Sequence, residues 1–181
     1  MGRLFVVSGP AGTGKGTVVK ELIARRVAEL SISATTRAPR GQEKNGIEYH
    51  FLERGEFERL ISEDGFLEYA EYCGNYYGSP KKPIDEWISQ GKNVILEIEV
   101  QGYQKIKEKR PDCVGIFIMP PSLEELEKRL RGRNTETEEQ IQKRLKRAGE
   151  EIPLSKLYDY VVVNDTVEKC ADEIEKIFDN I

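Results

Sequence analysis

Short apolar runs alternate along this chain with segments in which apolar residues recur every three or four positions. Residues 4–8, 114–119 and 160–163 are nearly continuous apolar runs, and 93–98 is rich in β-branched residues. Runs of this kind are typical of strands buried in a parallel sheet. Helical spacing fills most of the intervals, so the pattern predicts an α/β fold, a parallel sheet flanked by helices. The helices of this repeating pattern are predicted over 17–28, 100–110, from 122 onward, 135–151 and 165–177.

The segment between the first predicted helix and the strand at 93–98 differs from the rest of the chain. Residues 33–91 are polar and rich in Gly, Pro, Tyr and charge. Strands are predicted there over 47–52, 66–72 and 75–77, and short helices over 56–61 and 84–89. We therefore expect a small, mobile α+β subdomain inserted into one domain that covers 1–181.

Polar residues mark the starts of the later helices. Ser122 with Glu125, and Thr135 with Glu138, have the spacing of capping boxes. Asp165 with Glu168 can cap the last helix in a similar way.

Composition narrows the classes of function. With 181 residues the chain has room for one domain with an insertion. Its net charge of −4 argues against a nucleic-acid partner held by bulk positive charge. Cys73, Cys113 and Cys170 form no CxxC pair, and His50 is the sole histidine. This argues against a disulfide framework or a zinc site and disfavours a Ser-His-Asp triad.

Targeting and membrane signals are also missing from the sequence. The apolar run after Met1 is too short for a signal peptide, and the run at 114–119 is too short to span a bilayer. We expect a soluble cytoplasmic protein with no membrane partner. The sequence leaves its oligomeric state open.

The strongest chemical signal follows the first strand. Residues 9–15 match G-x-x-x-x-G-K, the phosphate-binding loop, between a predicted strand and a predicted helix. Loop amides and the positive end of the helix bind a polyphosphate, and Lys15 reaches its β- and γ-phosphates. The residues expected to contact ATP here are Gly9, Pro10, Ala11, Gly12, Thr13, Gly14, Lys15, Gly16 and Thr17.

The position after Lys15 departs from the common loop. Gly16 stands where Ser or Thr usually binds Mg²⁺, and Thr17 follows one place later. Two possibilities stay open for the metal. Thr17 is a ligand, or the ion is held by waters and ATP oxygens with help from Glu97 at the end of its strand.

Two further clusters could form a second site. Arg37 and Arg40, braced by Pro39, can form a fork for an anion, although a solvated basic loop explains them equally well. Tyrosines within 68–79 could line a cleft or could cover the apolar face of a small sheet.

The ordered set of segments resembles the guanylate kinase family from about Phe5 to Ile177. It comprises GPAGTGKGT, SATTRAPR, NGIEYHF, YAEYCGNYYGSP, LEIEVQG, RGRNTETEEQIQKRL and VVVND. The resemblance implies a P-loop NTPase-type sheet with an inserted nucleotide-binding subdomain and a helical lid. It implies transfer of the γ-phosphoryl group of Mg-ATP to GMP or dGMP, with Mg²⁺ as the cofactor. The implied limits are 1–32, 92–128 and 150–181 for the core, 33–91 for the GMP-binding subdomain and 129–149 for the lid.

The resemblance also implies residue roles on the GMP side. The family's contacts to the GMP phosphate match Arg37, Arg40, Tyr49 and Tyr77, and its guanine contacts match Ser33, Glu68 and Glu99, with Ser79 nearby. One carboxylate can accept both N1–H and N2–H of guanine, whereas adenine presents an acceptor at N1. Glu99 departs from the family, which more often has Asp there. Ordinary strand-end charge is the competing explanation for Glu97 and Glu99.

On the ATP side, Arg133 and Arg144 match lid arginines that close on the phosphates. With Lys15, Arg37 and Arg40 they form the expected catalytic set. Arg129, Lys143 and Arg147 are expected on a solvated helix face. Asn164 matches a position near adenine, although a turn residue before Asp165 is an equal explanation.

Two alternatives to a guanylate kinase follow from the same motifs. One is an adenylate-kinase-like enzyme with another base specificity, against which Glu68 and Ser33 argue because they suit guanine. The other is a non-catalytic guanylate-kinase-like module that binds proteins, against which Lys15 and the lid arginines argue.

Overall fold

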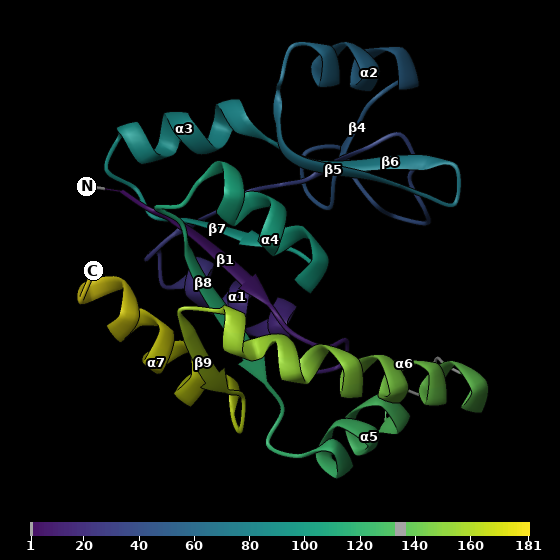
Figure 1. Cartoon of the computed structure of the whole chain (residues 1–181), viewed down its shortest axis with the longest axis vertical. Coiled ribbons are helices and arrows are strands. Elements are labelled where there is room, and N and C mark those ends of the chain that lie inside the picture. The colour runs from purple at the N-terminus through teal and green to yellow at the C-terminus, as the bar shows by residue number, and fades with distance from the viewer. Residues whose placement is uncertain (1, 133–136) are drawn as a thin grey trace.

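The central sheet is parallel throughout and carries the first strand at its middle (Figure 1). A computed structural model describes residues 2–132 and 137–181. The strand order is β2 (Glu29–Leu30), β7 (Val94–Glu97), β1 (Leu4–Ser8), β8 (Val114–Met119) and β9 (Tyr160–Val163). Parallel neighbours need crossover connections, which the helices provide. The predicted fold class is therefore confirmed.

Helices cover both faces of this sheet. On one face, α1 (Lys15–Ala24) and α7 (Val167–Asp179) pack against alternate residues of β1, Phe5 and Val7. On the other, α3 (Lys81–Ser89) and α4 (Val100–Lys109) pack against Leu4 and Val6. Because β1 is buried on both faces, its sequence is apolar without alternation.

A second, smaller sheet stands apart from the central one (Figure 1). Its strand order is β4 (His50–Phe51), β3 (Ala34–Thr35), β6 (Asn75–Pro80) and β5 (Phe66–Tyr72). Helix α2 (Arg54–Ser62) packs on it, with the Phe57 and Phe66 rings stacked at 4.3 Å. This sheet has a hydrophobic cluster of its own, and the limits 33–91 for an inserted subdomain stay a prediction.

Helices α5 (Leu123–Gly132) and α6 (Glu138–Glu151) pair beside the core. Leu126 and Leu130 of α5 contact Ile141 and Ala148 of α6. Helix α6 continues into the 3₁₀ helix η1 (Ile152–Leu157), which leads to β9. The lid limits 129–149 stay a prediction.

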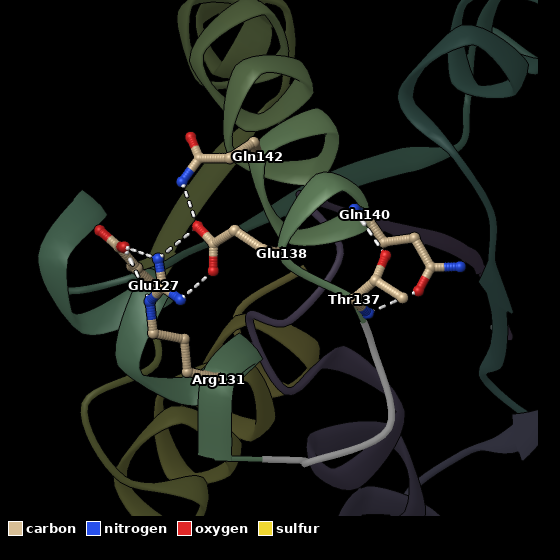
Figure 2. Close-up of polar contacts among 6 residues, drawn as sticks. All are labelled: Glu127, Arg131, Thr137, Glu138, Gln140 and Gln142. Atoms are coloured by element: carbon tan, nitrogen blue, oxygen red, sulfur yellow. Dashed lines mark hydrogen bonds and ion pairs between the residues drawn. The ribbon is translucent and has the colours of Figure 1, made fainter.

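The capping box of α6 lies two residues beyond the predicted one (Figure 2). The N–H of Thr137 donates to Gln140 Oε1 at 2.8 Å, and the N–H of Gln140 donates to Thr137 Oγ1 at 3.3 Å. Glu138 instead accepts hydrogen bonds from Arg131 of α5 and from Gln142. Thr135 lies outside the described residues. Thr135 with Glu138 and Thr137 with Gln140 have the same spacing, so the sequence alone does not distinguish them. The predicted box was wrong because Glu138 pairs with Arg131 and Gln140 completes the box instead.

Other element limits also differ from the predictions. Helix α1 ends at Ala24 instead of 28, because Arg26 takes a left-handed backbone with φ of 60°. Thr166, and not Asp165, caps α7 by accepting from the N–H of Lys169. The predicted cap at Ser122 is confirmed, since its hydroxyl accepts from the N–H of Glu125. Among the described residues, no helix is long and apolar enough to cross a membrane.

Candidate active site

The glycine loop joins β1 to α1 at the carboxyl end of the central sheet. Gly9 has φ of 147°, and a Cβ on it would lie 2.3 Å from the carbonyl oxygen of Ile118 in β8. The ammonium of Lys15 donates to the carbonyl oxygens of Gly9 and Pro10 at 2.6 and 3.1 Å. The structure therefore forms the predicted loop, with its lysine folded back over it. Its backbone amides and the start of α1 suit a polyphosphate.

A buried side chain that follows the edge strand β9 donates a hydrogen bond to this loop. Asn164, at the end of β9, donates from Nδ2 to the carbonyl oxygen of Thr13 at 2.6 Å. Its own N–H donates to the carbonyl oxygen of Met119 at 2.9 Å, and the Thr13 hydroxyl donates to that of Pro10. Asn164 is thus more than a turn residue, because it fixes the loop's backbone. Its expected place near adenine stays a prediction.

Glu97, the last residue of β7, faces the start of α1. A Cβ on Gly16 would lie 3.7 and 3.8 Å from the two Glu97 carboxylate oxygens. Burial raises the pKa of Glu97, and the nearby Lys15 ammonium opposes that shift. Magnesium commonly keeps several waters and takes one or two carboxylates plus phosphate oxygens. Glu97 fits that donor set, and its carboxylate lies beside Gly16. Thr17 as a ligand stays a prediction.

One side chain of the predicted anion fork, that of Arg37, already binds an anion, the carboxylate of Glu43. Both terminal nitrogens of Arg37 donate to it at 2.9 and 3.0 Å. The N–H of Arg40 donates to the same carboxylate at 2.7 Å, while the Arg40 side chain is exposed. Arg37 holds the pKa of Glu43 below its usual range. The alternative of a solvated loop is thus not supported for Arg37, which is largely buried.

Two tyrosines border this fork. The Arg37 guanidinium lies 5.5 Å from the centre of the Tyr49 ring. Tyr49 and Tyr77 meet edge to face, with ring centres 6.1 Å apart. Burial raises the pKa of the Tyr49 hydroxyl, and the charge of Glu97 across the site adds to the shift. The structure thus gathers Arg37, Tyr49 and Tyr77 in one place.

A half-buried carboxylate forms the next part of the site. Glu68 of β5 accepts a hydrogen bond from the Ser79 hydroxyl of β6 at 2.8 Å. Burial raises its pKa, and the hydrogen bond from Ser79 partly offsets the shift. A Cβ on Gly102, in the first turn of α4, would lie 3.7 Å from Glu68 Oε2. Ser33, before β3, is half-buried and accepts from the N–H of His50 through its carbonyl oxygen.

A cavity of about 300 Å³ connects the loop to α6. Its lining combines the glycine loop, the N-cap residue of α4 and the inner face of α6. The lining residues are Gly9, Ala11, Lys15, Glu99, Arg144, Arg147 and Glu151. Arg144 and Lys15 thus line the same cavity, whereas Arg133 lies outside the described residues. The expected role of both arginines at the ATP phosphates stays a prediction.

Both arginines expected on a solvated face make contacts beyond their own helix, although Arg147 is exposed as expected. Arg129 donates to the carbonyl oxygens of Asn164 and Asp165 at 2.9 and 3.2 Å, so it ties α5 to the end of β9. Arg147 pairs with Glu99 and Glu151 at the cavity. Lys143 pairs with Glu139 on the exposed face, as expected. The sequence pattern missed the contacts of Arg129 with Asn164 and of Arg147 with Glu99, because these partners lie 35 and 48 residues away along the chain.

Known proteins resemble this chain over most of its length. The guanylate kinase family model matches residues 1–181. The chain belongs to the guanylate kinase family. A guanylate kinase of Clostridium acetobutylicum is 53% identical over 176 residues, which span 97% of this chain and 84% of that protein. One from Halalkalibacterium halodurans is 54% identical over 177 residues, spanning 97% of this chain and 87% of that protein.

A solved structure of the family shares the architecture. The crystal structure of guanylate kinase from Anaplasma phagocytophilum matches with a TM-score of 0.77 and 40% identity, covering 99% of this chain and 85% of that one. Family membership over nearly the whole chain confirms the resemblance seen in the sequence motifs. It does not favour an adenylate-kinase-like enzyme or a non-catalytic binding module.

Proposed function

We propose that this chain transfers the γ-phosphoryl group of ATP to GMP, giving ADP and GDP. Its family supports the reaction, and one observation carries the choice of acceptor. Glu68 is a half-buried carboxylate, held by Ser79 beside the first turn of α4. Such a carboxylate suits the adjacent N1–H and N2–H donors of guanine and opposes the N1 acceptor of adenine. Ser33 and Glu99 complete the proposed base contacts.

The phosphate of GMP is proposed to bind at the arginine fork. The Glu43 carboxylate is bound there by two nitrogens of Arg37 and by the N–H of Arg40, which supports an anion site at that place. Tyr49 and Tyr77 flank it and can donate further hydrogen bonds. In this proposal the base lies near α4, and the phosphate points toward Glu97 and the glycine loop.

The chemical step needs no general base. An ionised oxygen of the GMP phosphate attacks the γ-phosphorus of ATP, an O–P bond forms, and the bond from that phosphorus to the ADP oxygen breaks. The site's task is to bring two anions together and to stabilise the charge that spreads over the transferred group. Lys15, Arg37, Arg40, Arg133 and Arg144 are the proposed sources of that positive charge.

Magnesium bound with ATP would add positive charge at the transferred group. Glu97 is the proposed protein contact, directly or through water, because its carboxylate lies beside Gly16 at the start of α1. Closure of the 33–91 and 129–149 segments over the substrates would exclude water and prevent hydrolysis of ATP. The limits of these two segments, their closure and a cytoplasmic location stay predictions.

An acceptor panel tests the proposal. ADP release is measured with Mg-ATP and either GMP, AMP, CMP or UMP. Turnover is expected with GMP alone, and Glu68→Gln is expected to raise the KM for GMP much more than the KM for ATP. Turnover with AMP instead of GMP would remove Glu68 and Ser33 as base contacts. No turnover with any acceptor by the folded protein would overturn the proposed reaction.

A further inference from the structure

One arginine of α6 holds two carboxylates at the cavity. Arg147 Nη2 donates to Glu99 Oε2 at 2.6 Å, and its Nε donates to Glu151 Oε1 at 2.8 Å. Glu151 is one turn further along the same helix, and its side chain is only 12% exposed. Glu99 is 48 residues earlier in the chain, and its side chain is 71% exposed. The guanidinium is therefore fixed from within α6 and reaches across the cavity to Glu99.

This ion pair differs from most of the others on α5 and α6. Arg129–Glu125, Lys143–Glu139 and Arg131–Glu127 join residues one turn apart in one helix. Such exposed pairs contribute little to stability. The contact of Arg147 with Glu99 joins α6 to the N-cap residue of α4, and both residues line the same cavity as Lys15. The main effect of this ion pair is to select one conformation of the exposed Glu99 side chain.

Glu99 belongs to the turn that also contacts the proposed guanine carboxylate. The carbonyl oxygen of Glu99 accepts from the N–H of Gly102 at 2.9 Å, and Gly102 lies against Glu68. An ionised carboxylate has two oxygens, each able to accept more than one hydrogen bond. Arg147 takes Oε2, so Oε1 remains available for a donor on the base.

We propose that Arg147 is a positioning residue that holds the Glu99 carboxylate in place for guanine. The inference rests on the proposed function, which makes Glu99 a contact of the base. A flexible glutamate loses rotamer freedom when it binds a ligand, and a fixed one has less to lose. Loss of the guanidinium is therefore expected to raise the KM for GMP about tenfold, equivalent to about 1.4 kcal/mol. Neither the KM for ATP nor kcat should change by more than about twofold on this account.

Arg147→Met, Glu99→Gln and the double variant test this positioning role. Lys143→Met is the matched control, since it also removes one cation from α6 but contacts only Glu139 on the exposed face. Arg147→Met should raise the KM for GMP in the wild-type background and have no further effect after Glu99→Gln. Arg147→Lys should give an intermediate KM, because it keeps the charge and loses the planar fork. Unfolding midpoints of all variants check that the fold is intact, and Arg147→Lys replaces Arg147→Met in the cycle if the latter unfolds.

Several results would overturn this role. One is a fall in kcat with the KM for GMP unchanged, which would place Arg147 on the transferred phosphoryl group. Equal effects of Arg147→Met in both backgrounds, or no effect of Glu99→Gln on the KM for GMP, would also contradict it. Wild-type turnover of GMP separates these results from a failure of the proposed function, since that failure would abolish the reaction in every variant.

Discussion

Gly14 is a position at which a single methyl group should disturb the phosphate-binding loop. It is the residue before α1, with φ of 87°. A Cβ on it would lie 2.6 Å from Nδ2 of Asn164, the atom that donates to the carbonyl oxygen of Thr13. Gly14→Ala therefore strains the backbone and displaces the side chain that anchors the loop.

The expected loss in free energy of unfolding for Gly14→Ala has two parts. An alanine in the left-handed region costs about 1–2 kcal/mol. Displacing Asn164 breaks its hydrogen bond and leaves a buried amide unsatisfied, which costs about 1–3 kcal/mol more. Gly91→Ala isolates the first part, because Gly91 has φ of 80° and no atom lies within 4 Å of the position its Cβ would take. We expect Gly14→Ala to lower the free energy of unfolding by about 2–5 kcal/mol, and Gly91→Ala by about 1–2 kcal/mol.

Urea denaturation of Gly14→Ala, Asn164→Ala and the double variant measures how much of the loss in free energy of unfolding depends on Asn164. Once Asn164→Ala has removed the amide, adding Gly14→Ala should cost no more than Gly91→Ala does. Equal losses for Gly14→Ala and Gly91→Ala in the wild-type background would refute the role of Asn164. So would a Gly14→Ala loss that is the same with and without Asn164.

Three further variants probe the site and one helix start. Lys15→Met should lower turnover by about 10²–10³, with the free energy of unfolding changed by about 1 kcal/mol or less, and near-normal turnover would contradict its role. The KM for GMP should rise as the pH falls toward the raised pKa of Glu68, because the protonated acid cannot accept both guanine N–H groups. Glu68→Gln should remove the part of this pH dependence that comes from Glu68 and leave only the titration of GMP and ATP. Identical pH profiles of the KM for GMP in the wild type and in Glu68→Gln would contradict the role of Glu68. Thr137→Ala should lower the free energy of unfolding by about 1 kcal/mol, and the exposed control Lys143→Ala by less than about 0.5 kcal/mol.

The sequence pattern was sufficient for the buried strands but not for short elements. Residues 66–72, 114–119 and 160–163 form β5, β8 and β9 at the predicted limits. Strands β2 and β3 have two residues each, too few to show a periodicity, and they were missed. Their pairing is decided by neighbours far along the chain, such as β7 for β2 and β6 for β3.

The site shows the same division between local and distant determinants. The glycine loop was predictable because its spacing is local and its context is a strand followed by a helix. The engagement of Arg37 by Glu43 was not predicted, although Glu43 follows six residues later, because a loop has no fixed spacing. The contacts of Asn164 with Thr13 and of Arg147 with Glu99 depend on the packing of distant elements, which no local pattern records.

Transfer of label from ATP tests the central claim most directly. The wild-type protein is incubated with ATP labelled at its γ-phosphate, with Mg²⁺ and an equal mixture of GMP and AMP, and the labelled products are separated. The account predicts that the label appears in GDP, with little in ADP and little as inorganic phosphate. Label in ADP would show that AMP is the acceptor, and label released mainly as phosphate would show hydrolysis. Either result would contradict a site built to transfer a phosphoryl group to GMP.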